Sequence, residues 1–381
     1  MNQKKLTYTF IALYLLPWGM QCLVDNFIPV FVNSLSFTTE KTVGQVTAIG
    51  AIVTMITQLL WTSSADKAKN KGTVLAFSLV LLAISSTLFV FVKQNMTTLF
   101  AITILFYSCY LVHQPLIDSI VGESYEKTGK SFGFLRSFAS LGYALTGLLF
   151  GFVNHQSSKS FFYYVIALSL LSIIAAKLVP DSTVKKMTKE KSEKGFKNKN
   201  FILFLVFTLF LFIQTSMVTT FFPVYYSEIN NNIGLLSIAI GAGTFMEWGL
   251  MSFLGKKLEQ TSPKTVFLLV VVATLLRSLS IYLIQNEYWI LISVFLNGIV
   301  FGILWSVATP YLTKILPANQ LTGAQGVWTV VAFGIAKFIG SYLGGILAET
   351  FGLRNLFGII SVTLTVFALV TPLLFPRKKT L

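Results

Sequence analysis

Apolar runs of membrane-spanning length recur along the whole chain and constrain its fold more than any other feature. A helix needs roughly 20 apolar residues to cross the hydrocarbon core, and we count twelve such runs in the 381 residues. Only 11% of the residues are charged and 54% are hydrophobic, whereas about a quarter of a soluble globular chain is charged. The sequence therefore predicts an all-α integral membrane protein with twelve transmembrane helices.

The expected spans form two sets of six. We expect helices over residues 6–32, 43–63, 73–92, 97–121, 132–153 and 161–178, and then over 201–226, 233–254, 265–284, 288–313, 323–348 and 356–375. Pro17 and Pro29 are expected to break the first helix. Residues 181–200 hold seven lysines and no apolar run, which is typical of a solvated linker. We therefore expect an N-terminal six-helix bundle at 1–180, a cytoplasmic linker at 181–200 and a C-terminal six-helix bundle at 201–381.

The net charge of +15 is distributed in a way that predicts membrane topology. If the amino terminus is cytoplasmic, the inside segments hold 22 Lys and Arg, and the outside segments hold four, Lys41, Lys93, Lys159 and Arg354. Basic residues concentrate in cytoplasmic loops. We therefore expect a multi-pass protein of the cell membrane with both termini in the cytoplasm. The charge needs no nucleic-acid partner to explain it.

Motifs for enzymes, metals and cofactors find little support. Cys22 and Cys109 both lie in apolar segments, which disfavours a disulfide framework or a cysteine metal site. The stretch Gly129-Lys130-Ser131-Phe132-Gly133 fits a hydrolase nucleophile pattern, but that motif needs a preceding strand, and here it opens a membrane helix. We expect no cofactor, no metal and no enzymatic activity.

Asp118 and Arg136 form the most informative pair of residues. A short polar turn, Glu123 to Lys130, separates their two apolar segments, and each residue lies nine positions from the middle of that turn. If the segments are antiparallel helices, the acid and the base reach the same depth. Helical spacing gives each segment one polar and aromatic stripe, made of Tyr107, Tyr110, Gln114 and Asp118 on one side and of Gly133, Arg136, Ser140, Tyr143 and Gly147 on the other.

Six charged residues fall within the apolar segments: Asp25, Asp118, Glu247, Arg136, Arg277 and Lys337. A charge at the centre of a bilayer costs at least about 2.5–3.5 kcal/mol, and such residues often mark solute or ion pathways. Structural ion pairs that fix helix register remain the alternative. Hydrogen-bonding and flat aromatic side chains accompany the charges, and as a set facing one cavity they would suit a polar solute that contains a ring. They are Gln114, Gln214, Asn297, Trp248, Trp305 and Trp328.

These residues resemble the major facilitator superfamily over the whole chain, and within it the branch of the lactose permease and related oligosaccharide and nucleoside proton symporters. Asp66-Lys67, with Lys69 and Lys71, is similar to the acidic and basic loop between helices 2 and 3, although Ser63 stands where a Gly is usual. The segment Gly133–Tyr143 is similar to the branch's helix 5 signature. Glu247-Trp248-Gly249-Leu250-Met251 and Arg277 are similar to its segments in helices 8 and 9.

The resemblance implies roles for these residues. Asp118 takes the place of the helix 4 carboxylate that binds sugar hydroxyls together with the helix 5 arginine, here Arg136. Tyr143 takes the place of the aromatic residue that stacks on the sugar ring. Asp66 and Lys67 would belong to a gating loop. Helix 10 departs from the pattern, because Asn297 and Val300 stand where the permease has its proton-carrying His and Glu.

We therefore expect a secondary active transporter of the major facilitator fold that works by alternating access, with a small polar solute, protons and the lipid bilayer as partners. The leading function is proton-coupled uptake of a sugar or nucleoside by a monomer. The expected solute-binding residues are Asp118, Arg136, Gln114, Tyr143 and Asn297. Export of drugs or metabolites by the same fold is the alternative, and a non-transporting receptor or an intramembrane enzyme is a further one.

Proton coupling needs a group that binds a proton in one state and releases it in another. Desolvation disfavours the charged form of a buried carboxylate, and the candidates are Glu247, Asp25 and Asp118. Arg136 at matching depth is expected to keep Asp118 ionised, and Asp25 lies nearer the outside. Glu247 is the preferred carrier, with Arg277 approaching it in one conformation to drive the proton off. A permanent pair of Glu247 with Arg277, or a facilitator without coupling, is the alternative.

Overall fold

The computed structural model describes residues 2–92, 95–153, 159–180, 198–230 and 232–375, and every regular element within these ranges is a helix. The described residues form two compact units, one within residues 1–186 and 231–241 and the other within 187–230 and 242–381. Most of the expected linker, residues 181–197, lies outside the described residues. The two expected bundle boundaries therefore remain predictions.

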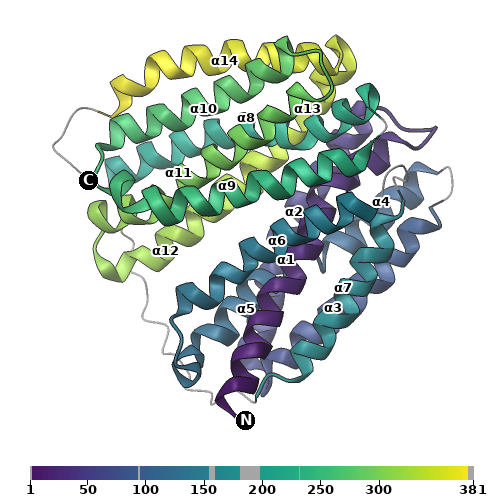
Figure 1. Cartoon of the computed structure of the whole chain (residues 1–381), viewed down its shortest axis with the longest axis vertical. Helices are drawn as coiled ribbons and strands as arrows, with labels where there is room; N and C mark the ends of the chain where they lie inside the picture. Colours follow the sequence, from purple (N-terminus) through teal and green to yellow (C-terminus); the bar gives the residue numbers. More distant parts are fainter. Residues whose placement is uncertain (1, 93–94, 154–158, 181–197, 231, 376–381) are drawn as a thin grey trace. The chain divides into compact units, whose positions relative to one another are not determined.

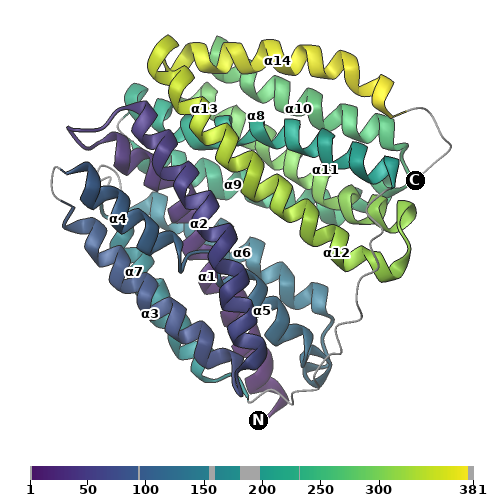
Figure 2. The same ribbon diagram turned by 180° about the vertical axis from the view of Figure 1, so that it is seen from behind.

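The first unit contains seven α-helices. They are α1 (Gln3–Asn33), α2 (Glu40–Lys67), α3 (Lys71–Val90), α4 (Met96–Tyr107), α5 (His113–Gly122), α6 (Phe132–Val153) and α7 (Phe161–Lys177), with the short 3-10 helix η1 (Tyr125–Thr128) before α6. α1 packs along α6 and α7, and α3 packs along α7 (Figure 1). α2 lies beside α4 (Figure 2). The first turns of α9 join this unit, where the Ser237 hydroxyl donates to the Gly147 carbonyl of α6 over 2.7 Å.

The second unit contains the remaining helices. They are α8 (Lys199–Ile229), the larger part of α9 (Ile233–Glu259), α10 (Pro263–Leu283), η2 (Trp289–Leu291), α11 (Ile292–Ile315), α12 (Ala318–Thr329), the π-helix η3 (Val330–Ile335), α13 (Ala336–Phe351) and α14 (Leu353–Leu374). α10 packs against α14 and α11, and α13 packs against α8.

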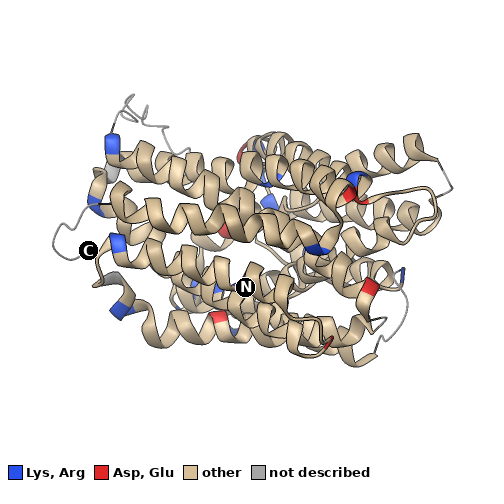
Figure 3. Cartoon of the chain, turned by 90° about the horizontal axis from the view of Figure 1, so that it is seen from above, with Lys and Arg blue, Asp and Glu red and all other residues tan. Residues whose placement is uncertain are grey.

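Length and composition support the expected membrane spans. Ten helices in the described residues are long and apolar enough to cross a membrane, and Met96–Tyr107 and Phe161–Lys177 are shorter apolar helices at the other two expected spans. Figure 3 shows how sparsely charged residues are placed along the ribbons. Large apolar side chains such as Phe253 and Leu373 are exposed on the protein surface, as expected for side chains that face lipid. The prediction of an all-α, twelve-span membrane fold is confirmed.

Several expected helix boundaries are wrong. The helices continue past the apolar runs, because polar residues can extend a helix into the interface: α2 ends at Lys67, so Asp66 and Lys67 lie in a helix and not in a loop. α1 runs without interruption through Pro17 and Pro29, since neighbouring helices can satisfy the freed carbonyls in a membrane protein. The expected helix over 97–121 is instead two helices, α4 and α5, and the expected helix over 323–348 contains η3.

Candidate functional site

One face of α1 organises the polar residues of the first unit. Tyr14, Trp18, Gln21 and Asp25 follow one another at spacings of four, three and four residues, which places them on one side of the helix. α1 packs against both α5 and α6. These two helices carry Gln114, Asp118, Arg136 and Tyr143, so the predicted residues meet around α1.

Asp118 and Arg136 form an ion pair, in which Arg136 Nε lies 3.3 Å from Asp118 Oδ1. The Tyr14 hydroxyl donates to the same carboxylate oxygen over 2.7 Å. Both charged side chains remain accessible, since 38% of Arg136 and 40% of Asp118 are exposed. The pair uses the Nε side of the guanidinium, so the terminal nitrogens of Arg136 can still grip two oxygens of a ligand in the bidentate manner of an arginine fork.

Aromatic rings surround the guanidinium of Arg136. Its central carbon lies 4.6 Å from the ring centre of Trp18 and 5.6 Å from that of Tyr14. A cation over an aromatic face at this distance is attracted by the ring quadrupole. The buried His113 packs edge-on against Trp18 at 5.0 Å. The rings hold the arginine in place without using its hydrogen-bonding capacity.

A second polar network lies further along the same face of α1. Gln114 Nε2 donates to Gln21 Oε1 over 2.8 Å, and Gln21 Nε2 donates to Asp25 Oδ2 over 3.1 Å. The chain of amides therefore links Gln114 to Asp25. Asn26 Nδ2 donates to the Tyr143 hydroxyl over 2.9 Å, which ties the predicted aromatic residue of α6 to α1.

The predicted residues of the second unit are arranged differently. Arg277 on α10 is 4% exposed, and its Nε and Nη1 have no hydrogen-bond partner within the described ranges. Among the same residues no ion pair joins it to Glu247, so this conformation lacks the pairing considered above. A Cβ on Gly298 would lie 3.3 Å from the Glu247 backbone nitrogen, so Gly298 of α11, the residue after Asn297, packs against the backbone of Glu247 in α9. The Asn297 Oδ1 is buried without a described partner.

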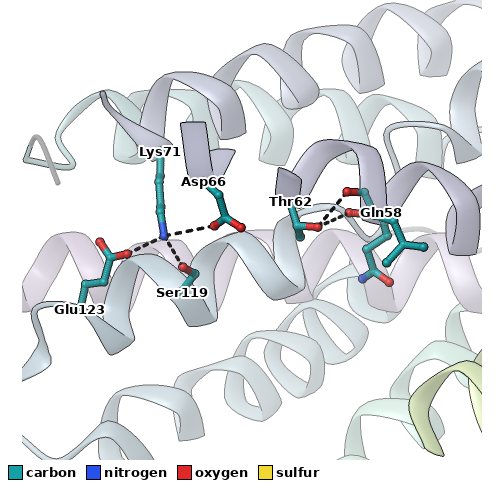
Figure 4. Close-up of polar contacts among 7 residues, drawn as sticks. Gln58, Thr62, Asp66, Lys71, Ser119 and Glu123 are labelled. Atoms are coloured by element: carbon teal, nitrogen blue, oxygen red, sulfur yellow. Dashed lines mark hydrogen bonds and ion pairs between the residues drawn. The ribbon is translucent and has the colours of Figure 1, made fainter. Parts of the chain in front are cut away.

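The predicted gating residues do not share one environment. The side chains of Asp66 and Lys67 are exposed at the end of α2, but it is Lys71, only 8% exposed, that joins three helices. Its ammonium lies 2.5 Å from Glu123 Oε1, 2.6 Å from Ser119 Oγ and 3.9 Å from Asp66 Oδ1 (Figure 4). The Lys71 cluster thus ties the ends of α2 and α5 to the start of α3, and Lys67 forms none of these contacts.

Sequence reasoning missed several residues of this site. Tyr14, Trp18 and Gln21 were not predicted, although their spacing with Asp25 follows one helix face. Lys71 was placed in the loop pattern but not in the gating pair. The four-three-four spacing on α1 was the available signal, and it was hidden because most residues around that face are apolar and 18 of the 31 residues of α1 are buried.

Comparison with known proteins identifies the family. The model of the MFS_1 like family matches residues 9–359. The chain belongs to the MFS_1 like family. This membership confirms the resemblance to the major facilitator superfamily, and it makes the protein a secondary transporter of the membrane and not an enzyme.

Relatives of this MFS_1 like protein carry names that refer to different solutes. It is 26% identical over 335 residues to the uncharacterized transporter YwbF of Bacillus subtilis, covering 84% of this chain and 82% of the relative. It is 21% identical over 357 residues to the maltose permease of Geobacillus stearothermophilus, covering 93% and 90%. It is also 24% identical over 367 residues to the quinolone resistance protein NorA of Staphylococcus aureus, covering 91% and 90%.

Solved structures share the fold. The nucleoside transporter NupG superposes with a TM-score of 0.85 at 18% identity, covering 99% of this chain and 100% of that one. A D-xylose-proton symporter superposes with a TM-score of 0.73 at 15% identity, covering both chains completely. These likenesses support the twelve-helix major facilitator fold.

Proposed function

We propose that this protein takes up a small polar solute with a ring, a sugar or a nucleoside, across the cell membrane by alternating access. The proposal rests chiefly on the half-exposed pair of Asp118 and Arg136 on the aromatic rings of α1. A carboxylate and a guanidinium side by side complement a pair of neighbouring hydroxyls, since one accepts hydrogen bonds and the other donates them. The similarity to a maltose permease and to the nucleoside transporter NupG supports this class of solute.

The Asp118–Arg136 pair is also suited to reversible binding. In this structure the two charges pair with each other, and both side chains are partly exposed. A solute whose hydroxyls enter between Asp118 and Arg136 replaces their mutual contact with hydrogen bonds to both side chains. Neither charge is then left without a partner, and an unpaired charge would be energetically costly. Gln114 and Tyr143 extend the binding face along α1, and Asn297 remains a proposed solute-binding residue within the second unit.

Transport is proposed to be coupled to protons, with Glu247 as the carrier and Arg277 and Asp25 as supporting residues. Within the described ranges the Glu247 carboxylate forms no ion pair, so no described cation competes with a proton for it. The D-xylose-proton symporter of the same fold supports this type of coupling. We place both termini in the cytoplasm, on the distribution of basic residues, and we propose that the protein acts as a monomer.

Uptake by proteoliposomes tests the proposal. Radiolabelled uridine, adenosine, maltose and xylose are offered separately under an inward proton gradient, and we expect saturable accumulation of at least one of them. Failure of all four to enter, or to raise the melting temperature of the purified protein, would contradict the proposed solute class.

Labelling of introduced cysteines tests the proposed membrane topology. A cysteine at Asn95 should react with impermeant reagents only from outside, and one at Thr261 only from inside.

Export of amphipathic compounds is a second candidate function. The likeness to NorA favours it, as do the aromatic contacts of the second unit, where Trp305 stacks on Phe333 at 5.6 Å and meets Trp328 at 5.6 Å. Proton-driven extrusion of a fluoroquinolone from vesicles, with loss of the sugar and nucleoside signals, would establish this alternative. Such a pump would also tolerate the loss of the Arg136 fork.

A further inference from the structure

The fourth span is interrupted between α4 and α5. Residues Ser108–Val112 leave the helical path, and Leu111 adopts φ +56°, the left-handed region that is rare for a leucine. Pro115 explains the position of the break. In a continuous helix its nitrogen would bond the Leu111 carbonyl, but proline has no N–H and its ring clashes with that carbonyl. Pro115 lies in the first turn of α5, where the missing N–H costs no hydrogen bond within that helix.

Three side chains of α2 satisfy the carbonyls that the break releases. Thr54 Oγ1 donates to the Tyr107 carbonyl over 3.1 Å, Trp61 Nε1 donates to that of Ser108 over 2.8 Å, and Gln58 Nε2 donates to that of Leu111 over 3.3 Å. Residues 54, 58 and 61 lie on one face of α2. In a continuous helix the carbonyls of Tyr107 and Ser108 would accept from amides four residues further along the chain, whereas that of Leu111 would face Pro115, which has no N–H. We call these three side chains the α2 clasp.

The break separates α5 mechanically from α4. Among the described residues no backbone hydrogen bond runs across Leu111 from one helix to the other. α5 is therefore a short rod. The α2 clasp bonds the end of α4 through Thr54 and Trp61 and the break through Gln58, and the far end of α5 is held by the Lys71 cluster, where Ser119 and Glu123 accept from the Lys71 ammonium (Figure 4). This rod carries Gln114 and Asp118, two residues of the solute site.

We propose that Leu111 is a hinge that lets α5 tilt independently of α4 during transport, and that Gln58 and Trp61 are positioning residues that hold Asp118 in the conformation described here. Side-chain bonds between helices can break and re-form one at a time, whereas the backbone bonds of a continuous helix resist bending together. The role of the hinge rests on the proposed function, because Asp118 acts there on the solute.

Distances between spin labels test the hinge without any solute. Cysteines replace Thr97 on α4 and Gly122 on α5, two exposed positions, and a Cβ at Gly122 meets no atom within 4 Å. The reference pair replaces Gly133 and Phe152 on the uninterrupted α6. The native Cys22 and Cys109 are buried, and their lack of labelling is checked directly. We expect a broad or bimodal distance for the α4–α5 pair and a single narrow one for the α6 pair.

The clasp variants decide between a hinge and a rigid kink. Trp61→Phe keeps the ring and removes the donor, and we expect it to shift the α4–α5 populations by about fivefold, the value of one neutral hydrogen bond, with the α6 distance unchanged. Thr62→Val is the matched control, since the Thr62 hydroxyl bonds only to carbonyls of its own helix. A narrow α4–α5 distance that Trp61→Phe leaves unaltered would overturn the hinge.

A transport measurement separates positioning from simple structural support. With uridine as the probe, we expect Trp61→Phe and Gln58→Met to lower the maximal rate severalfold while KM changes less than twofold. Gln58→His, which keeps a donor, should restore part of the rate. Equal loss in KM and rate, or no loss, would contradict the positioning role. If wild-type vesicles transport no uridine, the nucleoside proposal fails, and the label distances still accept or reject the hinge.

Discussion

The intramembrane charges of the two units are held in opposite ways. In the first unit, Asp118 and Arg136 lie 3.3 Å apart and remain partly exposed; Tyr14 contacts both, and Trp18 lies against Arg136. In the second unit, Arg277 is buried with two nitrogens unsatisfied, and no described ion pair joins it to Glu247. The two charges of the first unit compensate each other in this structure. In the second unit the buried Arg277 has two nitrogens without a described partner, which is energetically unfavourable, and a conformational change that supplied a partner would remove that penalty.

This difference separates two tasks of a symporter. A solute can exchange places with the partners of a satisfied, accessible pair at little cost. A carboxylate without a partner responds instead to protonation, because only the neutral form tolerates a desolvated position. The first unit is therefore the candidate for solute binding, and the second is the candidate for proton coupling.

The largest effect is expected from Glu247→Gln, which tests whether the second unit couples transport to protons. A neutral side chain cannot carry a proton, so solute should exchange across vesicles but should no longer accumulate. Under a gradient of one pH unit, one coupled proton concentrates solute up to about tenfold, and the variant should reach only equality. Counterflow and uptake assays measure the two properties.

The exposed Glu349 on α13 provides the control, since Glu349→Gln makes the same chemical change outside the predicted site. Normal accumulation by the Glu247 variant would transfer the coupling role to Asp25 or end the symport hypothesis.

Arg136→Lys tests whether the first unit binds the solute. Lysine keeps the charge but loses the planar fork, and two hydrogen bonds to a charged group are together worth about 3 kcal/mol. We expect solute affinity to fall by about a hundredfold, measured by equilibrium binding, with protein yield and melting temperature little changed. Arg354→Lys, in which the native arginine donates to the Tyr282 carbonyl, is the matched substitution and should keep affinity. Unchanged affinity in Arg136→Lys would make the pair structural.

Much of the fold was predictable because it depends on averages over many residues. Span length, the sparsity of charge and the distribution of lysines follow from the physics of the bilayer and need no tertiary contacts. The depth match of Asp118 and Arg136 followed from equal distances to a short turn. Helix ends were less predictable, since hydropathy marks where the membrane ends, and α2 continues past that point to Lys67.

The remaining features depend on contacts between distant segments. Pro115 is a visible signal for a break, but a proline alone does not say whether a helix bends or is interrupted, and α1 continues through both of its prolines. The break persists because Thr54, Gln58 and Trp61 lie 47 to 53 residues earlier in the chain and reach its carbonyls. Likewise Lys71 and Lys67 are equivalent in the sequence pattern, and only packing buries the first.

Comparing Lys71→Gln with Lys67→Gln measures how much a buried, hydrogen-bonded ammonium adds to stability relative to an exposed one. Removing the buried ammonium leaves Glu123 and Ser119 without their shared donor, and we expect a loss of about 1–3 kcal/mol in stability. The Lys67 side chain is exposed, so its loss should change stability by less than about 0.5 kcal/mol. Unfolding in detergent, followed by tryptophan fluorescence, measures both. Equal losses would return the gating role to the Asp66–Lys67 pair.

The smallest effect is expected from Tyr14→Phe, which alters the solute pair without changing its charge. The Tyr14 hydroxyl donates to Asp118 Oδ1 over 2.7 Å, and its removal leaves the carboxylate free to turn. Because 40% of the Asp118 side chain is exposed, water can take the place of the hydroxyl, and the net loss should be near that of a neutral hydrogen bond, about 1 kcal/mol. Binding assays should then show about a fivefold weaker affinity.

Tyr8→Phe on the same helix, where the ring is largely exposed, should leave affinity unchanged. A hundredfold loss in Tyr14→Phe would mean that Tyr14 itself contacts the solute. No loss would mean that the solute does not depend on the orientation of Asp118, and the first unit would then bind through Arg136 and its aromatic neighbours alone.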